Sequence, residues 1–323
     1  MRKPWDSFDR VLAVSDAETQ IELRGFASLP WSEFILNPRR LRGSDFLMRW
    51  SQGVWSERRV VEAVNATGSY FALPYGLSAV APDRDVREFE LYFERLDRAG
   101  LGGVKRPDIL LYEASSVERV QTVVNQVGGE PELPFTPEDD HRMQFLLSTA
   151  ILAVECENSL WRAKAMPHYG QPLRPTKRLG GKPGLPKSTV VPTVIVKEED
   201  RAPLRLWQEQ RRVPIHIWHV FYDAAFGLPL DRAEELIRDG LIEPREQVFQ
   251  APGGATTKKV IYNFYYHYAY LLGECIEEPT LVAAHIEDKN GHILPYVCIE
   301  GGRLVLRSGG LDALQYASGR RGV

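Results

Sequence analysis

Short apolar segments alternate with charged and turn-forming segments along the middle of the chain. Apolar runs of about four to eight residues, rich in β-branched and aromatic side chains, predict buried strands. Longer segments with apolar residues three or four positions apart predict helices. The predicted strands cover 69–73, 109–112, 151–157, 190–197 and 215–222, and the predicted helices cover 57–66, 85–98, 138–149 and 230–239. We expect Ser56 to cap the first of these helices.

The last part of the chain is predicted to be rich in strands. They are expected at 259–270, 280–287 and 292–299, with Asn290-Gly291 as the turn of a hairpin. This order predicts an α/β fold with a mixed central sheet flanked by helices and a β-rich C-terminal part. We expect an N-terminal accessory segment at 1–50, a core at 51–240 and a β-rich extension at 241–323 that packs on the core.

Three acidic residues stand where the strand pattern is otherwise apolar. Asp108 precedes one predicted strand, and Glu155 and Glu157 lie within the next. Side chains alternate along a strand, so Glu155 and Glu157 share one face while Cys156 points to the other. Burying such carboxylates is costly unless a cation neutralises them, and hard oxygen ligands favour Mg²⁺. Solvated acids on an edge strand, or ion pairs with nearby arginines, are the alternative.

Charge is nearly balanced over the whole chain but uneven along it. The 323 residues carry 40 basic and 43 acidic side chains. Between Ser159 and Lys197 there are eight Lys or Arg residues and no acidic residue, and Glu198-Glu199-Asp200 follows directly. Basic and acidic blocks side by side indicate a polyanionic partner and a divalent cation.

The basic segment is predicted to form an exposed arm at 159–189. Five prolines and four glycines within 167–187 favour a loop. Its cations would neutralise DNA phosphates, and a solvated loop is the alternative. The predicted DNA contacts are Arg162, Lys164, Arg174, Lys177, Arg178, Lys182 and Lys187.

Composition also excludes several classes of protein. Hydrophobic residues make up 44% of the chain, which is typical of a globular protein. No apolar run approaches the roughly 18 residues that cross a bilayer. The charged N-terminus and three widely spaced cysteines predict a cytoplasmic protein without disulfides. His216 and His219, three apart on a predicted strand, would point to opposite faces, which favours packing over paired metal ligation.

The order Pro107-Asp108 and then Glu155-x-Glu157 on an apolar strand resembles the PD-(D/E)xK nuclease signature in its E-x-E variant. The neighbouring residues extend this resemblance: Trp55-Ser56-Glu57 and the segments 70–76, 105–110 and 154–159. Together they are similar to type II restriction endonucleases over residues 50–225. The resemblance implies a helix followed by acid-bearing strands, with the active site at one edge of the sheet. It also implies Mg²⁺-dependent, sequence-specific cleavage of double-stranded DNA.

The resemblance assigns roles to individual residues. Asp108 and Glu155 would ligate the metal, and Glu157, which replaces the family's usual lysine, would act as a further ligand or as the general base. Lys197, at the end of the following strand, is the alternative source of the missing ammonium group. An acid from the first helix often completes such a site, and the candidates are Glu57 and Glu62.

The implied substrate bears on the assembly. A palindromic duplex matches a two-fold symmetric protein, so we expect a homodimer with one active site per subunit. One alternative is a repair or recombination nuclease of the same fold that selects DNA structure. The other is a DNA-binding protein without catalysis, whose acids are structural.

Overall fold

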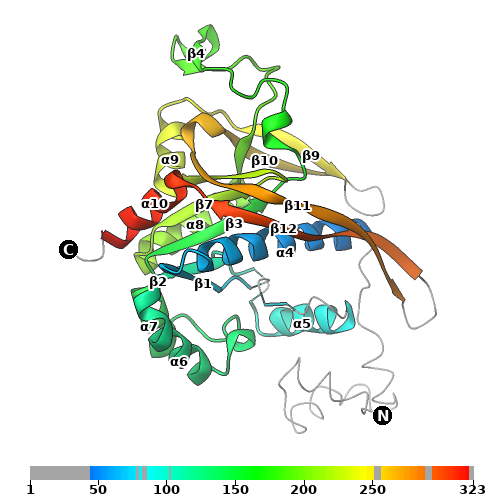
Figure 1. Cartoon of the computed structure of the whole chain (residues 1–323), viewed down its shortest axis with the longest axis vertical. Coiled ribbons are helices and arrows are strands. Elements are labelled where there is room, and N and C mark those ends of the chain that lie inside the picture. The colour runs from blue at the N-terminus through cyan, green and yellow to red at the C-terminus, as the bar shows by residue number, and fades with distance from the viewer. Residues whose placement is uncertain are drawn as a thin grey trace.

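A mixed seven-stranded sheet forms the centre of the molecule (Figure 1). The computed structural model describes residues 44–77, 80–81, 86–101, 103–250, 256–287 and 293–319. In order across the sheet, the strands are β1 (Tyr70–Pro74), β2 (Ile109–Glu113), β3 (Leu152–Asn158), β7 (Ile215–Val220), β8 (Ala224–Pro229), β11 (Tyr270–Glu287) and β12 (Ile293–Leu306). Neighbouring strands are antiparallel except β3 and β7, which are parallel. The predicted α/β class with a mixed central sheet is confirmed.

Two smaller sheets lie outside the central one. A three-stranded sheet contains β6 (Thr193–Lys197), β10 (Thr256–Tyr265) and β9 (Arg245–Gln250), with β10 in the middle. The short strands β4 (Arg174–Pro175) and β5 (Pro183–Gly184) pair within the long loop that follows β3. In Figure 1 this loop extends from the top of the molecule as an arm, in agreement with its proline- and glycine-rich sequence.

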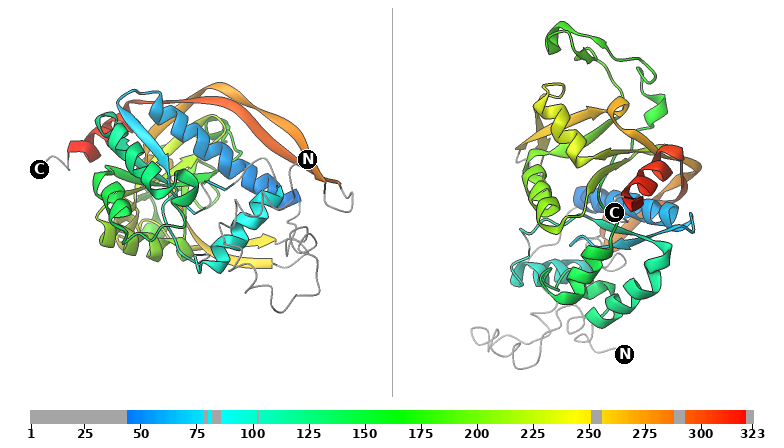
Figure 2. Two further views of the ribbon diagram at one scale, coloured as in Figure 1. Left: turned by 90° about the horizontal axis from the view of Figure 1, so that it is seen from below. Right: turned by 90° about the vertical axis from the view of Figure 1, so that its left-hand side faces the viewer.

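Seven α-helices are seen in the described part of the chain. They are α4 (Ser44–Asn65), α5 (Val86–Arg98), α6 (Val117–Val127), α7 (His141–Thr149), α8 (Glu198–Arg211), α9 (Leu230–Arg238) and α10 (Ser308–Gly319). Short 3-10 helices are η2 (Ala114–Ser116), η3 (Glu130–Glu132), η4 (Ala163–Ala165), η5 (Lys177–Leu179) and η6 (Tyr266–Tyr268). Helices α5, α6 and α7 gather at the end of the molecule opposite the arm (Figure 2). None of the helices among these residues is long and apolar enough to cross a membrane.

Apolar side chains cover both faces of the central sheet. On one face, Val194 of β6 and Leu204 of α8 belong to the same buried cluster as Ile217 of β7. On the other face, Val60 of α4 belongs to the cluster of Trp218, which follows Ile217 on β7. The sheet therefore lies between α4 and α10 on one side and the three-stranded sheet with α6 to α9 on the other.

Helix α4 begins earlier than the sequence indicates. Ser56 was expected to cap a helix at 57–66, but α4 spans Ser44–Asn65 and contains Ser56 in its interior. The Ser56 hydroxyl is buried and donates to the Gly53 carbonyl 2.8 Å away, one turn back in the same helix, so the N-cap prediction is wrong. The expected boundary at residue 50 also falls inside this helix.

The C-terminal strands continue the central sheet. β11 pairs with β8 and with β12, so the β-rich part after residue 240 shares hydrogen bonds with the core. The β11 and β12 strands pair antiparallel up to Glu287 and Ile293. The predicted turn at Asn290-Gly291 and the N-terminal segment up to residue 43 lie outside the described residues.

Candidate metal centre

The candidate site lies where strand β3 extends beyond its neighbour β2. The two strands pair only as far as Ile109 and Val154, whereas β3 continues beside β7 to Asn158. Asp108, directly before β2, takes over where the ladder ends: its carboxylate oxygen Oδ2 accepts a hydrogen bond from the Cys156 backbone N–H at 2.8 Å. This edge of the sheet therefore brings Asp108 beside the two acids of β3.

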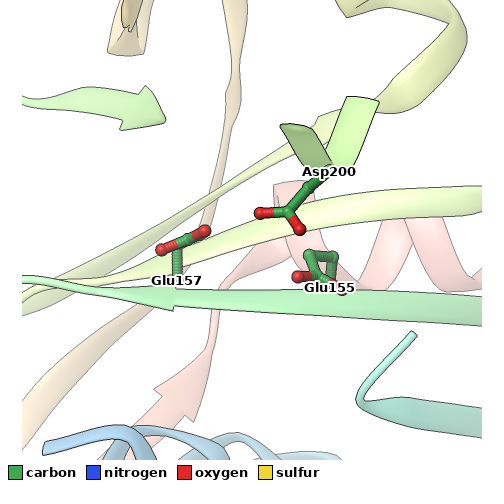
Figure 3. A group of neighbouring side chains, drawn as sticks. All are labelled: Glu155, Glu157 and Asp200. Carbon is green, nitrogen blue, oxygen red and sulfur yellow. The ribbon is translucent and has the colours of Figure 1, made fainter. Parts of the chain in front are cut away.

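Three carboxylates converge at this edge (Figure 3). Glu155 and Glu157 of β3 and Asp200 of α8 each have a carboxylate oxygen within 4.8 Å of the other two. The alternation of β3 places Glu155 and Glu157 on the same face, as predicted from the sequence, and α8 lies over that face. Two oxygens bound to one Mg²⁺ at about 2.1 Å lie at most about 4.2 Å apart. Small side-chain rotations would thus suffice for these acids to share one ion.

Glycine at position 76 gives Asp108 its space. A Cβ atom on Gly76 would lie 2.9 Å from the Asp108 Cα and 3.0 Å from its Oδ1. The backbone N–H groups of Tyr75 and Gly76 both donate to the Asp108 carbonyl, at 2.7 and 2.9 Å. The turn after β1 therefore holds Asp108 by its backbone and leaves its carboxylate facing β3.

Two lysines pair with the acids. Lys105 donates to Glu155 and its Nζ lies 3.6 Å from Asp200. Lys197, the last residue of β6, bonds Glu157 at 2.7 Å, and its Nζ lies 3.8 Å from Asp200. Burial opposes the charge of both lysines, but the neighbouring carboxylates raise the pKa of each. Both lysines are therefore ammonium ions that bridge pairs of acids.

Of the two candidate acids on α4, only Glu57 reaches the cluster. Burial, together with the charges of Asp108 and Glu155, raises the pKa of Glu57 well above its usual value. Glu62 is exposed and lines a surface hollow between α4 and β12. The expectation that one of the two faces the site agrees with the structure, which selects Glu57 and leaves Glu62 outside.

The cluster carries more negative charge than the protein neutralises. Glu57, Asp108, Glu155, Glu157 and Asp200 provide five carboxyl groups against the two ammonium groups of the lysines. Three negative charges remain if all five acids are ionised. Burial and neighbouring acids raise the pKa of Glu155 and of Asp108, which shows how costly this surplus is.

One atom in the cluster is suited to a metal ion. Glu155 is only 5% exposed, and its Oε2 is buried without a hydrogen-bond partner among the described residues, whereas its Oε1 accepts from Lys105. A buried carboxylate oxygen without a partner is unfavourable in a folded protein. Hard oxygen donors, surplus negative charge and an unpartnered oxygen fit Mg²⁺, with Glu155, Glu157 and Asp200 as the residues that would hold it.

The basic arm has paired and unpaired cations. Arg162 pairs with Glu278, Lys164 with Glu274 and Arg178 with Glu243, and Lys182 donates to the Asp239 carbonyl. The other three predicted contacts are exposed and form no ion pair with another described residue. We call these three the free arm cations: Arg174, Lys177 and Lys187.

The two histidines of β7 pack in the core, as their spacing predicted. His216 Nδ1 lies 2.8 Å from the Tyr270 hydroxyl, and His219 stacks on Phe221 with 4.6 Å between ring centroids. Burial lowers the pKa of His216 to about 4, and burial together with Lys197 lowers that of His219 to about 3. Both imidazoles are neutral at physiological pH.

Sequence reasoning missed two members of the site, Asp200 and Lys105. Asp200 belongs to the acidic block that follows Lys197, and Lys105 precedes the Arg106-Pro107-Asp108 motif. Neither has a local pattern that singles it out. Acids in the first turn of a helix are common because they interact favourably with the helix dipole.

Comparisons of this chain with protein-family models, with curated protein sequences and with solved structures give no match. A function is therefore inferred from the fold and the side-chain geometry of the chain itself.

Proposed function

We propose that the chain is a Mg²⁺-dependent endonuclease of the type II restriction class, which hydrolyses phosphodiester bonds in double-stranded DNA. The observation that carries the proposal is the surplus of carboxylates around the unpartnered Glu155 Oε2, at a sheet edge where a helix and two strands meet. The preceding helix α4 and the acid-bearing strands that follow it support the resemblance to PD-(D/E)xK nucleases.

The proposed chemistry divides between the two ends of the cluster. Glu155, Asp200 and Asp108 lie at the end nearest α4 and would hold Mg²⁺. When bound, the ion stabilises negative charge on the phosphate and acidifies a water molecule. Glu157, bonded to Lys197 at 2.7 Å, takes the proton of the water that attacks phosphorus. The bond from phosphorus to the leaving oxygen breaks, and that oxygen takes a proton from solvent.

Substrate binding is proposed for the arm. The free arm cations lie on the loop that leaves the end of β3, the strand that carries Glu155 and Glu157. Arm and acids thus belong to one continuous stretch of chain, which favours a phosphate backbone that runs from one to the other. We propose that two subunits act on the two strands as a homodimer, in the cytoplasm.

Digestion of a sequenced plasmid with Mg²⁺, followed by run-off sequencing of the ends, tests the proposal. We expect discrete fragments from the natural protein. Asp108→Asn and Glu155→Gln should abolish cleavage while leaving site-specific DNA binding, because each removes one charge of the cluster with little change in size. Glu62→Gln is the matched control, since Glu62 is an acid of the same helix as Glu57 but lies outside the cluster.

The other outcomes favour the alternatives. Cleavage at junctions or flaps without a fixed ladder would indicate a structure-selective repair nuclease. Binding without cleavage at any Mg²⁺ or Mn²⁺ concentration would indicate a DNA-binding protein with structural acids. Wild-type cleavage by Glu155→Gln would contradict the assignment of the site.

A further inference from the structure

We infer that Lys105 is a built-in substitute for the metal ion: its ammonium group neutralises Glu155 in the metal-free protein and leaves Glu155 when a divalent cation binds. This inference rests on the proposed metal centre. It assigns a role to a lysine that lies outside the two acidic motifs and on neither strand that carries the acids.

The Lys105 ammonium group occupies the place that the metal ion would take. Its Nζ donates to Glu155, the most buried acid of the three that converge, and lies 3.6 Å from Asp200. It therefore stands between two of the three acids that would hold the ion. An ammonium and a divalent cation repel each other at such short range, so both cannot occupy the space between Glu155 and Asp200.

The Lys105 side chain also has room to move. Lys105 lies between α5 and β2 in a segment without regular structure, and its side chain is 26% exposed. The next residue anchors this segment: Arg106 is buried and donates to the carbonyls of Leu133 and Thr136, both at 3.1 Å. The backbone is thus fixed, and the flexible four-carbon side chain of Lys105 alone has to swing toward solvent.

Lys197 is less suited to this exchange. It ends β6 and directly precedes α8, so its backbone is held on both sides by regular structure. Its partner is Glu157, 2.7 Å away, whose carboxylate is the proposed base rather than the buried ligand with the unpartnered oxygen. The exchange is therefore assigned to Lys105, while Lys197 stays with Glu157.

The exchange predicts two opposite effects of one substitution. Lys105→Met keeps a long apolar side chain and removes the charge. Without metal, the acids lose a neutralising partner, so the variant should unfold at a lower temperature than the natural protein. With metal, no ammonium competes, so the affinity for Mn²⁺ should rise by about tenfold or more. A lysine that only positions the acids would lower metal affinity together with stability.

The measurement is calorimetric titration with Mn²⁺ in the absence of DNA, at pH 8 and again at pH 9, so that protonation of Glu155 does not mask the gain. Thermal unfolding with and without Mn²⁺ accompanies it. Lys105→Arg should retain the natural affinity within about threefold, because it keeps the charge. Lys187→Met, an exposed lysine of the arm, is the matched control and should change neither quantity.

The results distinguish this inference from the proposed function. Tighter Mn²⁺ binding by Lys105→Met than by the natural protein supports the exchange. Equal or weaker binding by a folded Lys105→Met variant overturns it but leaves the metal centre intact. Absence of Mn²⁺ binding by the natural protein as well as the variant overturns the metal centre and the exchange together.

Discussion

A single methyl group at Gly76 should disturb the site through Asp108. The added Cβ would lie 2.9 Å from the Asp108 Cα and 3.3 Å from the Pro107 carbonyl oxygen, whereas ordinary contacts begin near 3.4 Å. Relief requires a shift of about half an ångström, comparable to overpacking in a core, which costs about 1–3 kcal/mol. Neither side yields easily, because Asp108 bonds to the Tyr75–Gly76 turn through its carbonyl and to Val154 through its N–H at 2.8 Å.

Gly76→Ala is therefore expected to lower the free energy of unfolding by about 1–3 kcal/mol. Because misplacement by about 1 Å can cost about a hundredfold in rate, we expect about a tenfold slower single-turnover cleavage. Chemical denaturation and quenched-flow cleavage of a cognate duplex measure the two effects. Gly53→Ala is the control: its Cβ meets nothing within 4 Å, and alanine favours the α4 helix, so stability should hold or rise. A Gly76→Ala enzyme with natural stability and rate would refute the close packing of Asp108.

Three further perturbations test other parts of the molecule. Glu157→Gln should lose most single-turnover activity and Lys197→Ala much less, since Glu157 must be ionised to act; a near-normal Glu157→Gln enzyme beside an inactive Lys197→Ala enzyme would make Lys197 the catalytic residue. Replacement of the three free arm cations by glutamine should reduce the salt dependence of DNA binding by about 0.9 in log–log slope for each phosphate that the arm no longer neutralises, and an unchanged slope would make the arm a solvated loop. Burial and Lys197 lower the pKa of His219 to about 3 from 6.5, so the folded state resists protonation that the unfolded chain accepts, and stability falls as the pH falls below 6.5. His219→Phe should flatten that fall in urea titrations between pH 6.5 and 4, and an equally steep curve would place the proton elsewhere.

The local patterns of the sequence predict the acids of β3 well. Strand periodicity alone places Glu155 and Glu157 on one face and Cys156 on the other, and the structure has this arrangement because β3 stays regular beside β7. The prediction for Ser56 was wrong because a serine inside a helix and a serine at its start look alike in sequence. Its hydroxyl bonds the preceding turn, and α4 continues toward the N-terminus through Leu47, which is buried.

Elements with few apolar residues were harder to predict. Helix α8 buries only Leu204 and Trp207 and has Pro203 within it, so its sequence lacks a clear apolar stripe. Its first turn nevertheless supplies Asp200 to the site. The proximity of Asp200 to Glu155 depends on the path of the chain between β3 and β7, which no local period encodes.

That path explains why arm and site are linked. Strands β3 and β7 are parallel, and parallel neighbours need a crossover connection that leaves one end of the sheet and returns at the other. Here the crossover contains the arm, then β6, then α8. It therefore supplies the free arm cations as well as Lys197 and Asp200, whereas Asp108, Glu155 and Glu57 belong to elements that precede it. In the proposed complex, force applied to the arm by a bound duplex would reach Lys197 and Asp200 through β6, while the other acids would stay fixed in the sheet and in α4. Half of the cluster would thus be coupled to substrate, and the other half would be rigid.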